Sequence, residues 1–179
     1  MSKPITQILQ TLKNRQSVTM LKSFSQKYTP FQILVSTVMS ARTRDTTTIP
    51  IAEKLFQKYK TPQDFTNTSL KELEKAIYGI GFYHTKAKNI KLLSEILIKE
   101  YNSIVPKDIN KLLALPGVGR KTANCVLCYA FNEPSIPVDV HVHRISNRIG
   151  LVATKTPEET EKALEKIVPK NMWLDVNEL

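Results

Sequence analysis

Two residues of this chain have the types and spacing that amine chemistry requires: Lys121 and, 18 positions later, Asp139. A lysine amine is a nucleophile only when it is neutral, and its ordinary pKa is about 10.4. The positive end of a helix and the adjacent Arg120 both disfavour the ammonium form, so we expect a lowered pKa for Lys121. Asp139 is then the carboxylate that receives the proton. The simpler interpretations are a solvated or phosphate-binding lysine and an aspartate that caps a helix.

A tight turn between two helices must position Lys121. Pro116 is compatible with a helix that ends there, and Gly117 and Gly119 are predicted to supply the positive φ values of a sharp reversal. Beyond the turn, apolar residues recur at the spacing of one helix face, at Ala123, Val126, Leu127, Ala130 and Phe131. The free N–H groups of this helix N-terminus therefore lie beside Arg120 and Lys121, which predicts a site for an anion such as phosphate.

Three separated motifs of the chain resemble the helix-hairpin-helix base-excision DNA glycosylases, in particular their endonuclease III-like members. The motifs are Leu115–Ala123, Val138-Asp139-Val140-His141 and Ile80-Gly81-Phe82-Tyr83, and the resemblance runs from about Pro30 to about Pro169. It implies an all-α, two-lobed fold with a cleft between the lobes. It also implies a bifunctional glycosylase/AP lyase that excises oxidised or deaminated pyrimidines through a Lys121 Schiff base and nicks the strand by β-elimination. Asp139 is implied as general base or electrostatic stabiliser.

The resemblance also implies contacts with duplex DNA, because such an enzyme must turn the damaged nucleotide out of the helix. Arg42 lies in the loop 40–45, which matches the family loop that plugs the resulting gap and in which bacterial relatives usually carry glutamine. Phe82 matches the wedge on a second hairpin, with a core aromatic as its alternative. The remaining implied DNA-binding residues are Tyr83, Gly117, Gly119, Arg120, Thr122 and His141. Lys86 and Lys88 open the next helix, as phosphate contacts or as a solvated face.

Charge and composition restrict the class of protein. The net charge of +10 and the pI ≈ 9.6 favour a polyanionic partner such as DNA, with a generally basic protein as the plain alternative. No uninterrupted apolar run reaches the roughly 20 residues of a membrane helix, and residues 1–5 lack the apolar core of a signal peptide. Cys125 and Cys128 lie three apart on one predicted helix, which disfavours a disulfide. We therefore expect a monomeric, cytoplasmic protein.

The rest of the chain predicts helices with matching N-terminal signals. Amphipathic stretches lie at 5–12, 31–39, 49–59, 70–77 and 87–101. Capping boxes are predicted at Thr29, Ser69 and Thr156, each followed three positions later by Gln or Glu, and Thr61 precedes a proline-started turn.

One segment, 135–145, alternates apolar and polar residues with the period of a strand. Pro137 lies inside it and no second convincing strand exists, so we expect an extended segment followed by a helix that begins near Asp139. The expected organisation is a six-helix lobe at 20–133, which ends in the helix-hairpin-helix motif, and a second helical lobe made of 1–19 and 134–179.

Metal and cofactor motifs are incomplete in this chain. Cys125, Cys128, His141 and His143 carry zinc-binding atoms, but a cysteine pair at helical spacing is typical of a core, so no metal site is predicted. The run 119–122 lacks the glycines of a nucleotide-binding loop. The family's [4Fe–4S] cluster is held by a four-cysteine loop that these 179 residues lack, and we therefore predict no cofactor in this chain.

Two other functions stay open. One is a monofunctional mismatch glycosylase, against which Lys121 argues because such relatives generally lack lysine at that place. The other is a non-catalytic helix-hairpin-helix DNA-binding module, which has no need for Asp139 or for a two-lobed cleft.

Overall fold

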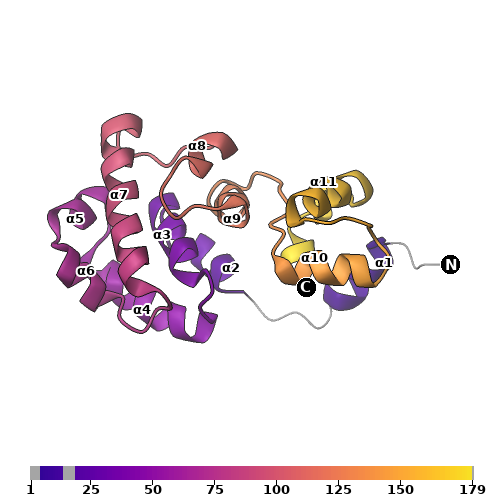
Figure 1. The fold of residues 1–179 in the computed structure, drawn as a ribbon, viewed down its shortest axis with the longest axis horizontal. Coiled ribbons are helices and arrows are strands. Elements are labelled where there is room, and N and C mark those ends of the chain that lie inside the picture. Colours follow the sequence, from indigo (N-terminus) through magenta and orange to yellow (C-terminus); the bar gives the residue numbers. More distant parts are fainter. Residues whose placement is uncertain (1–4, 14–18, 179) are drawn as a thin grey trace.

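The computed structural model describes residues 5–13 and 19–178, and this part of the chain is helical with no strand (Figure 1). The all-α prediction is confirmed. None of the described helices has the length and hydrophobicity to span a bilayer.

Two hydrophobic clusters divide the helices into two lobes, seen at the left and right of Figure 1. The first cluster is built from α2 (Met20–Ser25), α3 (Pro30–Ser40), α4 (Asp45–Lys58), α5 (Pro62–Asn67), α6 (Leu70–Ala76), α7 (Tyr83–Tyr101), α8 (Ile109–Leu113) and α9 (Arg120–Phe131). These are eight helices where six were predicted. Apolar periodicity indicated five of them, whereas α2, α5 and α8 have six, six and five residues, too few to show a helical period in the sequence.

The second lobe joins the two ends of the chain. Its elements are α1 (Ile5–Lys13), α10 (Val140–Arg148), α11 (Pro157–Ile167), the 3₁₀ helix η1 (Lys170–Met172) and α12 (Asp175–Glu178). Leu9 of α1 is buried with Leu164 of α11 and Met172 of η1. The division at 19/20 and 133/134 stays a prediction, and Leu174 packs against the first cluster from beyond it.

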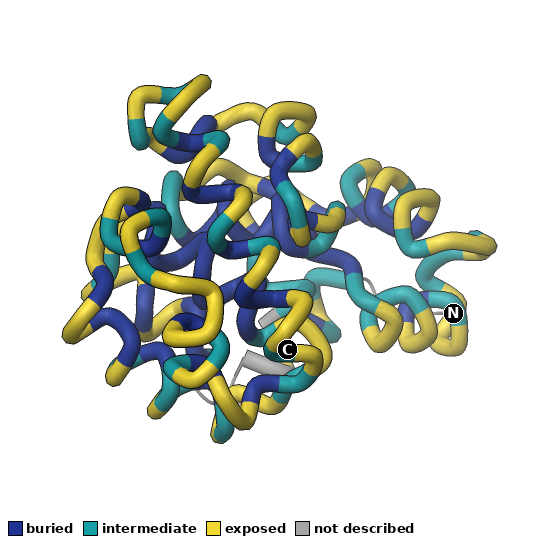
Figure 2. Tube along the Cα trace, turned by 60° about the vertical axis from the view of Figure 1, so that its left-hand side comes forward, coloured by how far each residue is buried: buried dark blue, intermediate teal, exposed yellow. Residues whose placement is uncertain are grey.

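Helix α3 is the centre of the first lobe, where buried residues run through the interior (Figure 2). Every residue from Phe31 to Met39 is buried, as expected for a helix that is apolar on all sides. The hydroxyls of Ser36 and Thr37 donate to the carbonyls of Gln32 and Ile33, so these polar side chains are satisfied within the helix. Because α3 packs along α9, it supports the helix that carries Lys121.

The helix caps follow local sequence closely. Thr29 and Ser69 form the predicted capping boxes, and Thr61 forms one as well. At Thr156 the predicted box is incomplete. The Thr156 hydroxyl accepts from the Glu159 N–H, but the Glu159 carboxylate accepts from the N–H of Lys155 instead of closing on Thr156.

The segment before α10 is extended and unpaired, and α10 begins directly after Asp139, as predicted. Ile136 and Val138 are buried in the second cluster. The Ser135 hydroxyl donates to the Asn124 carbonyl (2.9 Å), and the Asn124 amide donates to the Ile136 carbonyl (3.4 Å). These bonds tie the segment to α9, so the helix that carries Lys121 also holds the chain that leads to Asp139.

Candidate active site

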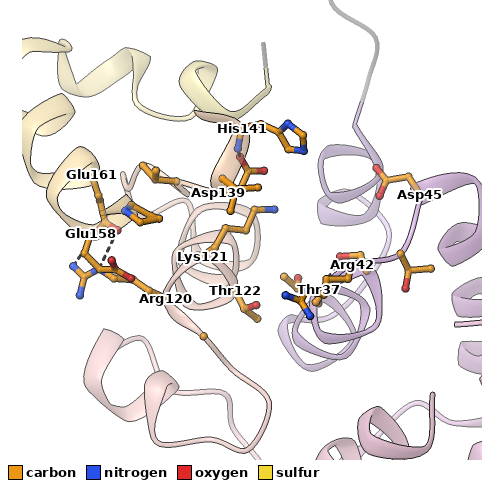
Figure 3. Close-up of a pocket in the computed structure, with 17 residues that line it drawn as sticks. Thr37, Arg42, Asp45, Arg120, Lys121, Thr122, Asp139, His141, Glu158 and Glu161 are labelled. Carbon is orange, nitrogen blue, oxygen red and sulfur yellow. Dashed lines mark hydrogen bonds and ion pairs between the residues drawn. The ribbon is translucent and has the colours of Figure 1, made fainter. Parts of the chain in front are cut away.

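A cleft of about 670 Å³ lies between the lobes and brings most of the predicted site residues together (Figure 3). Its lining includes Arg42, Gly119, Arg120, Lys121, Thr122, Asp139 and His141. Gly117, Phe82 and Tyr83 do not line it. A smaller adjoining cavity of about 190 Å³ is lined by Lys121 and Asp139 together with Ser40 and Asp45.

Lys121 occupies the first turn of α9, directly after Arg120 and the N-cap Gly119. Residues 122–129 behind it are all buried in the first lobe, so the backbone of Lys121 is fixed while its side chain faces the cleft. The buried Cys125 lies one turn further along α9, and burial raises the pKa of its thiol to about 11. The floor beneath Lys121 is therefore uncharged at neutral pH.

Asp139 is the N-cap of α10, and its Oδ1 accepts hydrogen bonds from the backbone N–H groups of His141 and Val142, both at 2.9 Å. The capping interpretation of Asp139 is thus correct, and the cap also orients the carboxylate. Within the described residues no ion pair joins it to Lys121, although both side chains line the same two cavities. The arrangement leaves space between an amine and a carboxylate for a reacting group.

Asp45, the last residue of the loop 40–45, is a further carboxylate at the site, and a role for it was not indicated by the sequence. It is the first residue of α4 and faces Lys121 and Asp139 from the other wall of the cleft (Figure 3). An acidic residue in the first turn of a helix is ordinary, so no sequence signal marks Asp45.

Arg120 does not point freely toward solvent. Its Nε and Nη2 donate to Oε2 and Oε1 of Glu161 in α11, at 2.9 and 2.8 Å. Glu161 is only 4% exposed, and the bond to it raises the pKa of Arg120. The pair is bidentate and connects the start of α9 to the second lobe. Glu161 was missed because it lies 41 residues away from its partner.

The two glycines of the hairpin differ. Gly117 has φ +79°, as predicted, and a Cβ there would lie 2.8 Å from Nδ2 of Asn89. Gly119 has φ −90° and ψ 176°, so the prediction of a positive φ was wrong for Gly119. Gly117 alone completes the reversal, and Gly119 is extended as the helix N-cap. No described atom beyond its neighbours lies within 4 Å of a Cβ at Gly119.

Arg42 and Phe82 stand on neighbouring loops, and both have left-handed backbones, with φ of 56° and 59°. Phe82 is 66% exposed, so the core alternative for it was wrong. Tyr83 stacks edge-on against Tyr78 and packs against the first cluster.

Lys86 is buried instead of exposed, contrary to both of its sequence interpretations, because its amine bonds to oxygens at the end of α3 and in the following loop. Lys88 is exposed.

Known proteins are similar to this chain over most of its length. The family described as "HhH-GPD superfamily base excision DNA repair protein" matches residues 35–170. Endonuclease III of Thermotoga maritima is 49% identical to this chain over 148 residues, 83% of this chain and 70% of that protein. Endonuclease III of Bacillus subtilis is 46% identical over 145 residues, 80% of this chain and 66% of that protein. The chain thus spans about two thirds of these relatives.

Two solved structures are similar to the fold. One is a trapped endonuclease III–DNA covalent intermediate, with a TM-score of 0.80 and 44% identity over 84% of this chain and 71% of that chain. The other is a non-covalent endonuclease III–DNA complex, with a TM-score of 0.83 and 40% identity over 97% of this chain and 82% of that chain.

The prediction of no cofactor was wrong. Endonuclease III relatives at this identity normally carry a [4Fe–4S] cluster, and a count of cysteines over two thirds of their length does not exclude it.

The two cysteines of this chain, Cys125 and Cys128, do not fit such a cluster. Cys125 and Cys128 are buried in α9, and Cys128 Sγ lies 3.0 Å from the Ser135 hydroxyl. Across 5–13 and 19–178, no group of three or more His, Cys, Asp or Glu side chains could hold a metal ion.

Substitution of the two hairpin glycines is predicted to separate their roles. We expect Gly117→Ala to lower the free energy of unfolding by about 2 kcal/mol, from a left-handed backbone and a contact with Asn89. Gly119→Ala should change it by less than about 0.5 kcal/mol. Urea denaturation measures both. Adding Asn89→Ala to Gly117→Ala should recover only the part caused by the contact. Equal losses at the two glycines would contradict the assignment of the reversal to Gly117 alone.

Loss of Arg120 is predicted to destabilise the protein more than loss of its partner. Arg120→Met leaves a buried carboxylate unpaired, which should lower the free energy of unfolding by about 3 kcal/mol. Glu161→Gln leaves an arginine that is one-third exposed and can be hydrated, so it should lower the free energy of unfolding by only about 1–2 kcal/mol. The exposed pair Lys27–Glu53 is the control, and Lys27→Met should cost less than about 1 kcal/mol. Denaturation of all three variants tests the order, and a Glu161→Gln loss above that of Arg120→Met would refute it.

Proposed function

Because this chain belongs to the HhH-GPD superfamily of base excision DNA repair proteins and is endonuclease III-like, we propose that it is a bifunctional DNA glycosylase/AP lyase. Its substrates are duplexes that contain oxidised or deaminated pyrimidines, or abasic sites. The observation that carries the proposal is the convergence of Lys121 and Asp139, from the N-termini of two helices, on one cleft between the lobes. A simple DNA-binding hairpin has no use for that cleft.

The glycosylase step begins with a proton transfer. Lys121 must lose a proton before its amine attacks C1′ of the damaged nucleotide, and Asp139 is the acceptor across the cleft. The Nζ–C1′ bond forms as the C1′–N glycosidic bond breaks, and the base leaves with the bonding electrons and takes up a proton. The Asp139 carboxylate stabilises positive charge on the sugar.

The lyase step uses the same amine. Opening of the sugar ring breaks the C1′–O4′ bond and gives an imine between Nζ and C1′, and the imine acidifies the C2′ proton. Loss of that proton and of the 3′ phosphate cleaves the strand, and water then releases Lys121. Asp139 Oδ1 is occupied by two backbone N–H groups, while Oδ2 carries no hydrogen bond among the described residues and is free to exchange protons.

DNA recognition in this proposal comes from the two loops beside the cleft. Arg42 enters the gap that the extruded nucleotide leaves and donates hydrogen bonds to the orphaned base. Phe82, which is exposed on its own turn, separates adjacent bases. The N–H groups at Gly117 and Gly119, with Thr122 and His141, contact the phosphates. The excess of basic residues favours this polyanionic partner.

We further propose that the protein acts as a cytoplasmic monomer. The cleft is lined by residues of a single chain, so no second subunit is needed to complete it. Both cysteines are free thiols, which suits a reducing compartment.

Borohydride trapping on a duplex with an abasic site tests the nucleophile. We expect the unmodified protein to form a covalent adduct and Lys121→Ala to form none, while Lys99→Ala, at an exposed lysine of α7, should match the unmodified protein.

Asp139→Asn keeps an Oδ1 acceptor for the α10 cap but accepts no proton, so base release should fall by about 10²- to 10⁴-fold.

Three results would overturn the assignment. One is an adduct of normal yield in Lys121→Ala. Another is DNA binding with neither adduct nor base release by the unmodified protein, which would indicate a non-catalytic module. The third, base release without an adduct, would indicate a monofunctional glycosylase.

The open space at Gly119 predicts a DNA-dependent requirement for glycine. A Cβ there would have no described atom within 4 Å apart from its chain neighbours, and Gly119 lines the cleft. Gly119→Ala should therefore raise the Kd for a duplex with a stable abasic-site analogue by about tenfold, or about 1.4 kcal/mol, with unfolding unchanged. Fluorescence anisotropy measures the Kd, and an unaltered value would exclude close approach of DNA at this point.

A further inference from the structure

Lys86 is a buried lysine outside the catalytic pair. It lies in the first turn of α7 and is 7% exposed. Its Nζ donates to the carbonyls of Met39 (2.7 Å) and Ala41 (2.5 Å) and to the hydroxyl of Thr43 (3.1 Å). These bonds use all three donors of the ammonium. Burial lowers its pKa to about 8, so the site holds a charge with neutral oxygens only.

The acceptors of Lys86 all belong to the end of α3 and the loop that follows it. Met39 carries one of the last carbonyls of α3, which have no partner within the helix, and a cation is favoured at that helix end. Ala41 is the C-cap of α3. Lys86 therefore caps the C-terminal end of α3, although it lies 45 positions after Ala41 in the sequence.

Thr43 joins the same loop to the turn before α7. Its hydroxyl oxygen accepts from the Gly81 N–H at 3.1 Å as well as from Lys86. The two loops are in close contact at this point, because a Cβ on Gly81 would lie 3.2 Å from both the Arg42 carbonyl and the Thr43 hydroxyl. Arg42, which precedes Thr43, and Phe82, which follows Gly81, both have left-handed backbones.

We propose that Lys86 and Thr43 form a clamp that sets the distance between the Arg42 loop and the Phe82 turn, and so positions the two side chains that enter the duplex. The inference rests on the proposed function, in which Arg42 fills the gap and Phe82 separates bases. Lys86 touches neither substrate nor reacting atoms and is a positioning residue. The clamp holds Arg42 and Phe82 in left-handed conformations, which are unfavourable for residues other than glycine and would relax if the loops were free.

If the clamp positions the two loops, variants that lose it should cleave an abasic site more slowly in duplex DNA but not in a single strand. An abasic site in a single strand has no partner base and leaves no gap, so its cleavage needs Lys121 and Asp139 but not the two loops. The measured quantity is the ratio of the duplex to the single-strand cleavage rate. Lys86→Met and Thr43→Val should lower this ratio by about tenfold or more. Lys86→Arg and Thr43→Ser keep the donor and the hydroxyl, and should restore most of it.

Lys91 supplies a matched control on the same helix. Its Nζ donates to the carbonyls of Thr66 and Thr68, so Lys91→Met removes the same kind of carbonyl-capping lysine away from the clamp and should leave the ratio unchanged. A second readout is the fluorescence of 2-aminopurine placed opposite a stable abasic-site analogue, which rises when the base unstacks. The rise should be smaller with Lys86→Met and Thr43→Val.

The outcomes separate the clamp from a general stabilising role. An unchanged ratio in Lys86→Met and Thr43→Val overturns the clamp, whether neither cleavage rate falls or both fall equally. If Lys86→Met does not fold, Thr43→Val decides alone. If the unmodified protein cleaves neither substrate, the proposed function has failed, and the aminopurine signal still tests the clamp.

Discussion

The bidentate ion pair between Arg120 and Glu161 is the contact on which the active-site geometry depends, because it is made between the two lobes. α9 packs into the first hydrophobic cluster and α11 into the second. A carboxylate as buried as that of Glu161 is tolerated only with a well-matched partner, so the pair specifies one arrangement of the lobes. The Asn124 amide adds a second tie, to the segment that leads into α10. Lys121 and Asp139 face one cavity as a result.

Helix N-termini organise the chemistry on both sides of the cleft. Lys121 follows the extended Gly119 at the positive end of α9, and Asp139 caps α10 with one carboxylate oxygen. The backbone N–H groups at the start of α10, which need partners at a helix end, therefore hold the proposed base in place. One arrangement at Asp139 serves both the helix cap and the proposed catalysis, so its capping role does not compete with the catalytic role proposed for it.

Three departures from local conformational rules lie on the two loops beside the cleft and on the helix that follows them. Arg42 and Phe82 are left-handed although neither is glycine, and Lys86 is a buried charge without a carboxylate partner among the described residues. Strain of this kind persists only where surrounding contacts hold it. By contrast, the left-handed Asn102 and Asn132 are C-caps of α7 and α9, where asparagine is ordinary.

The sequence by itself determined what depends on neighbours three or four residues away. The caps at Thr29 and Ser69, the start of α10 after Asp139 and the reversal at Gly117 follow from local hydrogen bonds and backbone sterics, and the motif spacing marked Lys121 through its family resemblance. Only the tertiary structure decided the partners of Arg120 and Lys86, the placement of Asp45 and the extended backbone of Gly119. Those outcomes depend on how helices pack, because burial and charge pairing join residues about 40 positions apart with no periodic trace in the chain.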